Sequence, residues 1–203
     1  MLLKIELSLM IKFLPNIITV FRIILVPFFV YFLISDIYHG KLIALFIFTI
    51  ASLSDMIDGK LARKYNIITK FGTFMDPLAD KILVVSALFV FVFFKIFPLW
   101  MLVVIIIRDF LITSLRIFME NNGQMMQTSN LGKLKTVAQF ISINFILLCL
   151  IFINYNFSVL ITFINDYSII YILMFITTVF TAITGFDYFV KNHKMIKLII
   201  LKK

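Results

Sequence analysis

The 203-residue chain contains one cysteine, and only 14% of its residues are charged. A single cysteine, Cys149, cannot form an intrachain disulfide, which excludes a disulfide-rich secreted domain. A disordered chain is excluded as well, because apolar residues make up 63% of the sequence and the mean hydropathy is +1.11. A soluble domain of this size would leave much of that apolar surface in water. The composition therefore predicts a polytopic membrane protein, with Cys149 as a small residue of its apolar interior.

Acidic residues are scarce too, with 10 Asp and Glu against 19 Lys and Arg, giving a net charge of +9. In a membrane protein such an excess reflects topology and contact with anionic lipid headgroups. We therefore expect membrane lipids as partners and no nucleic acid.

Six apolar stretches follow one another, and most approach the ~20 residues that cross a ~30 Å hydrocarbon core as a helix. They span residues 17–34, 42–61, 74–94, 99–118, 136–152 and 169–189. Before them, residues 1–13 alternate charged and apolar side chains, which predicts a short interfacial amphipathic helix ended by Pro15. No small-x-small cleavage site follows the first stretch, so no cleavable signal is expected. The expected fold is all-α: six transmembrane helices plus the interfacial helix (1–15), in one domain over residues 1–203.

The basic residues predict the orientation of this bundle. With six spans both termini share one side of the membrane, and that side receives 13 Lys and Arg against two, Lys41 and Lys95, on the other. This is a strong positive-inside signal. It places both termini, and the loops near residues 64–72 and 119–132, in the cytoplasm.

Several ionisable residues lie inside the expected spans, where they are costly and mark functional sites by default. Counted from the outer end of each helix at 1.5 Å per residue, Arg22, Asp55, Asp80 and Arg108 lie about 14 to 20 Å deep. A single polar cavity in the cytoplasmic half of the membrane would explain this shared depth.

The acidic residues of two neighbouring spans have helical spacing. Asp55 and Asp58 are three residues apart, Asp76 and Asp80 are four apart, and each pair therefore shares a helix face. Four carboxylates facing one another cannot all stay ionised without cations. Hard oxygen ligands of this kind favour Mg²⁺, Mn²⁺ or Ca²⁺. The alternative is that these acids pair with neighbouring Lys and Arg in a structural network. Four acids within 26 residues are more than such a network needs.

Together with the residues between them, these acids form a recognisable segment. It reads Asp55-x2-Asp58-Gly59-x2-Ala62-Arg63-x8-Gly72-x3-Asp76-x3-Asp80. This resembles the signature of the CDP-alcohol phosphotransferases at all eight fixed positions. The resemblance implies six helices, a homodimer and a two-metal site for Mg²⁺ or Mn²⁺ on the cytoplasmic side. It also implies that Asp55, Asp58 and Asp76 hold metal, that Asp80 is both ligand and general base, and that small or basic residues line the cytidine diphosphate site, namely Gly59, Ala62, Arg63 and Gly72.

Softer motifs extend the resemblance along the chain, toward the phosphatidylglycerophosphate synthases of bacterial inner membranes. They are Leu14-Pro15-Asn16-Ile17-Ile18-Thr19-x2-Arg22-x4-Pro27, Arg108-Asp109-x4-Ser114-Leu115-Arg116, Ser129-x2-Gly132-Lys133-Leu134-Lys135-Thr136-x2-Gln139 and Thr184-Gly185-x-Asp187-Tyr188. In the first of these, Asn16 and Thr19 are candidate contacts to the CDP-lipid, with helix capping or packing as the alternative.

The implied reaction transfers a phosphatidyl group from CDP-diacylglycerol to an alcohol and releases CMP. An acceptor that carries a phosphate needs cations, and arginine offers it a bidentate fork. Arg108 and Arg116 lie close to one face of a helix, and Lys133 and Lys135 enter from the next span. This cluster favours sn-glycerol 3-phosphate as acceptor and phosphatidylglycerophosphate as product, although Lys133 and Lys135 can also be read as cytoplasmic flank charges.

Other functions share parts of this pattern. The same chemistry can use inositol phosphate, serine or phosphatidylglycerol as acceptor. An intramembrane aromatic prenyltransferase also uses Asp-rich metal motifs, but it should have more spans and no Ala62-Arg63-x8-Gly72 element. A small transporter or channel would place its charges near the bilayer midplane, often within repeats.

Overall fold

The structure is a computed structural model that describes residues 2–64, 70–124, 126, 130–157 and 168–201. Within the helices it describes the backbone alone at 2–16, 55–64, 70–78 and 80, and at 130, 194, 198, 200 and 201. The chain divides into two parts. The first comprises Met1–Val90 with Leu147–Phe157, and the second comprises Phe91–Ile146 with Ser158–Lys203.

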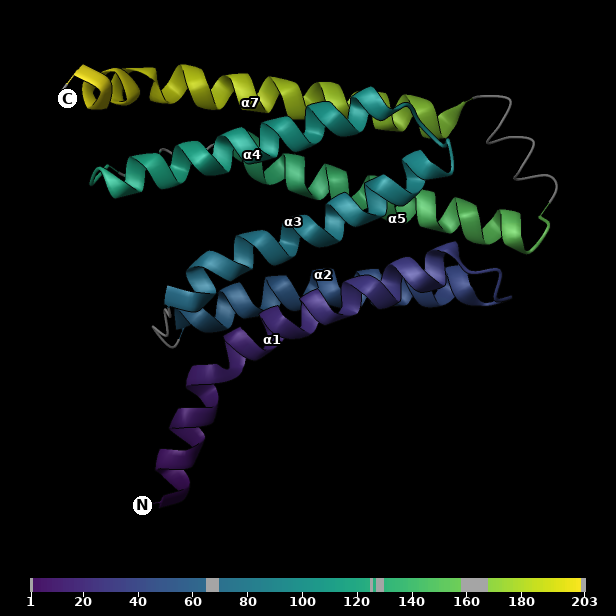
Figure 1. The fold of residues 1–203 in the computed structure, drawn as a ribbon, viewed down its shortest axis with the longest axis horizontal. Coiled ribbons are helices and arrows are strands. Elements are labelled where there is room, and N and C mark those ends of the chain that lie inside the picture. Colours follow the sequence, from purple (N-terminus) through teal and green to yellow (C-terminus); the bar gives the residue numbers. More distant parts are fainter. Residues whose placement is uncertain (1, 65–69, 125, 127–129, 158–167, 202–203) are drawn as a thin grey trace. The chain divides into compact units, whose positions relative to one another are not determined.

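All regular secondary structure in the described residues is helical, as the sequence predicts (Figure 1). The helices are α1 (Leu2–Ile34), α2 (Gly40–Lys64), α3 (Lys70–Phe93), α4 (Leu99–Asn121), α5 (Asn130–Asn154) and α7 (Ile169–Leu201). Each expected apolar stretch therefore lies within one helix, apart from residue 94 just after α3, although α1 and α5 begin well before their stretches. Three segments are long and apolar enough to cross a membrane: Ile17–Ile34, Leu131–Asn154 and Ile169–His193. The apolar segments Gly40–Ser54 and Lys81–Phe93 are shorter, so six crossings stay a prediction.

The expectation that Pro15 ends a separate N-terminal helix is wrong. Helix α1 continues through Pro15 for 33 residues, about 50 Å at 1.5 Å per residue. A proline inside a helix removes one hydrogen bond and clashes with the preceding turn, which bends the helix when the flanking turns persist. The ribbon of α1 bends in its N-terminal part, in agreement with this cause (Figure 1).

Three helices end in the same way, with one residue in the left-handed region. These residues are Lys95 after α3, Gly123 after α4 and Asn156 after α5, with φ of 58°, 72° and 57°. After α4, the Gln124 N–H donates to the Met119 carbonyl at 3.0 Å and the Gly123 N–H to the Glu120 carbonyl at 3.0 Å. This pattern satisfies the last carbonyls of the helix and stops it.

In the first part of the chain, α1 packs against α2. The rings of Phe29 and Phe48 lie 5.6 Å apart between these helices, and both side chains are fully buried. The turn between the helices leaves no space beside Gly40, because a Cβ there would lie 2.7 Å from the Phe32 carbonyl oxygen. Next to it, His39 Nδ1 and the Tyr155 hydroxyl form a 2.5 Å hydrogen bond, which joins this turn to the end of α5.

In the second part, α4 packs against α7. The C-terminal halves of both helices share a core of buried apolar side chains. This core consists of Ile112, Met119, Met126, Tyr188 and Ile199. Helix α7 thus extends well beyond the expected end at residue 189, because its last turns have apolar partners on and just after α4.

Candidate functional site

Arg108 lies in the middle of α4 and is mostly buried in the second part of the chain. Its Nη1 donates to Asp109 Oδ1 at 3.1 Å and its Nη2 donates to Thr184 Oγ1 on α7 at 3.1 Å. Its guanidinium carbon lies 5.6 Å from the centre of the Tyr188 ring, within cation–π distance. The guanidinium is therefore held by groups on two helices.

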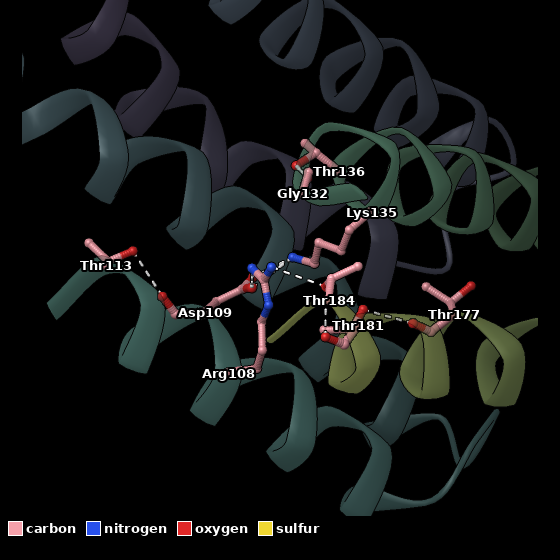
Figure 2. A network of polar contacts seen from close by, with 9 residues as sticks. All are labelled: Arg108, Asp109, Thr113, Gly132, Lys135, Thr136, Thr177, Thr181 and Thr184. Atoms are coloured by element: carbon pink, nitrogen blue, oxygen red, sulfur yellow. Dashed lines mark hydrogen bonds and ion pairs between the residues drawn. The ribbon is translucent and has the colours of Figure 1, made fainter. Parts of the chain in front are cut away.

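Asp109 is the centre of this polar cluster (Figure 2). Lys135, which enters from α5, donates from Nζ to both carboxylate oxygens of Asp109, at 2.8 and 2.7 Å. The Lys135 side chain is only 5% exposed and that of Asp109 17% exposed. Charge-assisted hydrogen bonds at these distances are strong, and removing one member of such a pair would strand the other. With Arg108 included, the three side chains carry a net charge of +1.

Two glycines allow the helices to approach at this point. A Cβ on Gly185 of α7 would lie 2.9 Å from Cγ of Arg108. A Cβ on Gly132 of α5 would lie 2.5 Å from the hydroxyl oxygen of Tyr188. Small residues at helix interfaces let neighbouring chains come this close, at the cost of intrinsic helix stability.

A line of buried hydroxyls continues from the cluster along α7. Thr184 donates to the Thr181 carbonyl at 2.8 Å, and Thr181 donates to the Thr177 carbonyl at 2.7 Å. Thr177 and Ser142 of α5 are hydrogen-bonded to each other at 2.8 Å. Such bonds between helices satisfy polar groups that have no water available. They also join α5 to α7 below the charged cluster.

The structure brings together two of the four residues expected to bind the acceptor phosphate. Arg108 and Lys135 meet at Asp109, whereas Arg116 and Lys133 have exposed side chains. Arg116 lies about two turns further along α4 than Arg108, toward the C-terminal end of the helix.

The signature aspartates lie on two helices of the first part. Asp55 and Asp58 belong to α2, Asp76 and Asp80 belong to α3, and their side chains lie outside the described residues. The helical backbone supports the expected sharing of a face within each pair. The donor set, four carboxylates, fits hard divalent cations. In the part of the chain whose side chains are described, no group of three or more His, Cys, Asp or Glu is found.

The residues expected to contact the CDP-lipid lie on α2 and α3 and also on α1. Thr19 is fully buried within α1, and Arg22, one turn further on, is 1% exposed. For the other candidates the structure describes the backbone alone; these are Asn16, Gly59, Ala62, Arg63 and Gly72.

Sequence reasoning gave no role to Asp109, Thr184, Gly185 or Tyr188, although each stands in a quoted motif. The available signal was the presence of Asp109 in a membrane-length apolar helix, which marks a functional candidate as clearly as Arg108 does. Its partner Lys135, 26 residues away on α5, could not be identified without the fold that brings the two side chains together.

Membrane-length apolar helices with charged side chains buried between them define the class, an α-helical membrane protein with an internal polar site. The family follows from comparison with known proteins. The family model described as CDP-alcohol phosphatidyltransferase matches residues 12–183, and the chain belongs to this family.

Similar proteins in three bacteria carry the name CDP-diacylglycerol–glycerol-3-phosphate 3-phosphatidyltransferase. The Bacillus subtilis protein is 36% identical over 196 residues, which covers 91% of this chain and 97% of the relative. The Haemophilus influenzae protein is 39% identical over 64% of this chain and 72% of the relative. The Escherichia coli K12 protein is 37% identical over 66% of this chain and 75% of the relative.

Proposed function

We propose that this protein transfers the phosphatidyl group of CDP-diacylglycerol to sn-glycerol 3-phosphate, giving phosphatidylglycerophosphate and CMP. The observation that carries the proposal is the similarity to the Bacillus subtilis enzyme of that name across nearly the full length of both chains. In this reaction the free primary hydroxyl of the acceptor attacks the phosphorus that bears the diacylglycerol. A new oxygen–phosphorus bond forms, and the bond from that phosphorus to CMP breaks.

The aspartates of α2 and α3 are assigned to the CDP end of the lipid. Asp55, Asp58, Asp76 and Asp80 would hold two divalent cations, Mg²⁺ or Mn²⁺, for which carboxylates are suitable ligands. When bound, such ions supply charge stabilisation for the diphosphate and the departing CMP. Asp80 additionally accepts the proton that the acceptor hydroxyl loses.

The residues around these aspartates bind the nucleotide portion. Gly59, Ala62 and Gly72 are small and allow close approach of the ligand to the helix backbone, while Arg63 contributes a cation for the phosphates. Asn16 and Thr19 of α1 are assigned to the CDP-lipid as well.

The basic residues of α4 and α5 bind the phosphate of the acceptor. The Arg108–Asp109–Lys135 cluster supports this assignment, because it is mostly buried, positively charged overall and built from residues of a single part of the chain. Arg116 and Lys133 attract the anion from the exposed side. A neutral polyol would not need such a cluster.

The remaining parts of the proposal concern the surroundings of the enzyme. We assign it to the bacterial cytoplasmic membrane, with six crossings, both termini and the active site in the cytoplasm, and residues 1–203 as one domain forming a homodimer. The excess of basic residues on one side supports this orientation.

A competition assay tests the acceptor assignment. Purified protein would receive CDP-diacylglycerol, Mg²⁺ and equal concentrations of sn-glycerol 3-phosphate, inositol phosphate, serine and phosphatidylglycerol, each carrying a different isotope. Nearly all labelled lipid should derive from sn-glycerol 3-phosphate. Preferential incorporation of another acceptor would overturn this assignment while preserving the phosphotransferase chemistry.

A further inference from the structure

Lys135 and Arg108 use the same carboxylate in different ways. Lys135 commits two of its three N–H donors to the oxygens of Asp109 and is almost entirely buried. Arg108 reaches Asp109 with one Nη1 hydrogen only, at 3.1 Å. The position of the lysine is thus fixed by the carboxylate, whereas the arginine touches it at one edge (Figure 2).

Arg108 keeps hydrogen-bond donors available while its side chain is held in place. A guanidinium has five N–H donors, and one from Nη1 and one from Nη2 are used by Asp109 and Thr184. Its Nε is buried without a hydrogen-bond partner among the described residues. Gly185 and Tyr188 of α7 border the side chain and its guanidinium group.

The charges explain why Asp109 does not occupy the whole arginine fork. Lys135 compensates the carboxylate and competes for both of its oxygens, so Arg108 retains its own charge for another anion. Without the lysine ammonium, both oxygens of the Asp109 carboxylate would be open to Arg108, the other cation of the cluster. Carboxylate–guanidinium pairs are frequently bidentate, and such a pair would remove the fork from an incoming phosphate.

We propose that Lys135 is a positioning residue that acts through Asp109, and that Arg108 is the member of the cluster that touches the acceptor phosphate. This inference rests on the proposed function and narrows its acceptor-binding set. Lys135 serves to compensate Asp109, and Asp109 serves to anchor one edge of the Arg108 guanidinium.

A double-mutant cycle separates this role from direct phosphate binding. Lys135→Met should raise the KM for sn-glycerol 3-phosphate about 10-fold or more, the loss expected for a charge-assisted contact. In Asp109→Asn/Lys135→Met the competing carboxylate is gone, and the asparagine oxygen still accepts from Arg108. This double variant should recover to within about 3-fold of the wild-type KM. A lysine that binds phosphate directly would leave the double variant at least as impaired as Lys135→Met, which would overturn the proposal.

Gly185→Ala provides a second test that changes no charge and removes no partner. The added methyl group would lie 2.9 Å from Cγ of Arg108 and must displace it, although alanine favours the helix. The KM for sn-glycerol 3-phosphate should rise while that for CDP-diacylglycerol stays constant. An unchanged acceptor KM would contradict the positioning of Arg108 even if Lys135→Met fails to fold.

Controls distinguish this inference from the function on which it rests. Glu120→Gln removes an exposed carboxylate from the same helix as Asp109 and should change neither KM. If wild-type protein does not use sn-glycerol 3-phosphate at all, the proposed function fails. If it does so and the double variant shows no recovery, only the inference fails.

Discussion

Replacing Arg108 by lysine keeps the positive charge of α4 but removes the planar fork that reaches Asp109 and Thr184 at once. The two acceptors are on different helices, each 3.1 Å from a different nitrogen of the guanidinium. A lysine ammonium is a point charge on a flexible stem and cannot reproduce this arrangement. Arg108→Lys should therefore weaken acceptor use even though the net charge is unchanged.

The magnitude follows from the contacts that are lost. One charge-assisted hydrogen bond to the acceptor phosphate contributes about 1.5–3 kcal/mol, which corresponds to a loss of about 10- to 150-fold. The cation–π contact with Tyr188 adds about 0.5–2 kcal/mol to the positioning of the side chain. Because the deeper Thr184–Thr181 and Ser142–Thr177 bonds do not involve Arg108, the helix packing should survive.

The assay is the initial rate of CMP release with each substrate varied separately. The kcat/KM for sn-glycerol 3-phosphate should fall by at least about 10-fold, and the KM for CDP-diacylglycerol should change by less than about 2-fold. Equal losses for both substrates would place Arg108 at the nucleotide or in the fold, and would refute the assignment of the cluster to the acceptor.

Three other predictions concern the rest of the molecule. Asp76→Asn should abolish turnover, and so should chelation, which excess Mg²⁺ should reverse. Asp36→Asn, an exposed control outside the signature, should keep full activity. Activity of the wild type in excess chelator would contradict the metal assignment. Gly40→Ala should cost about 1–3 kcal/mol of stability because its Cβ would meet the Phe32 carbonyl oxygen at 2.7 Å; thermal unfolding in detergent measures this, and an unchanged Tm would show that the turn can relax. In a Cys149→Ala background, a cysteine at exposed Lys197 should resist an impermeant thiol reagent in intact cells while one at exposed Asn156 reacts; the reverse labelling would invert the proposed topology.

The positions of the helices were readily predicted because long apolar runs must satisfy their backbone hydrogen bonds internally. The residues at which the helices begin and end depend on contacts that an apolar stretch of sequence does not reveal. Helix α1 continues through Pro15, and α7 continues to Leu201, where Ile199 joins a core with Met119. Packing between helices distant in sequence decides such boundaries, and local propensity does not.

The candidate site, too, could be predicted from the sequence only in part. Arg108 could be identified as a buried charge from its position in an apolar stretch. Lys135 stood at the edge of its expected span, and the carboxylate that binds both side chains could not be identified. Asp109 binds Lys135, which lies 26 residues further along the chain on another helix. Gly185 is needed because the Arg108 side chain passes directly beside it. Spacing along one helix predicts which residues share a face, whereas partners on other helices require the fold.

Isotope transfer tests the central claim most directly. The protein would be incubated with CDP-diacylglycerol and sn-glycerol 3-phosphate whose free primary hydroxyl carries ¹⁸O, and both products would be analysed by mass spectrometry. The account predicts phosphatidylglycerophosphate that retains the ¹⁸O, together with an equal amount of unlabelled CMP. CMP released without labelled phosphatidylglycerophosphate would contradict it.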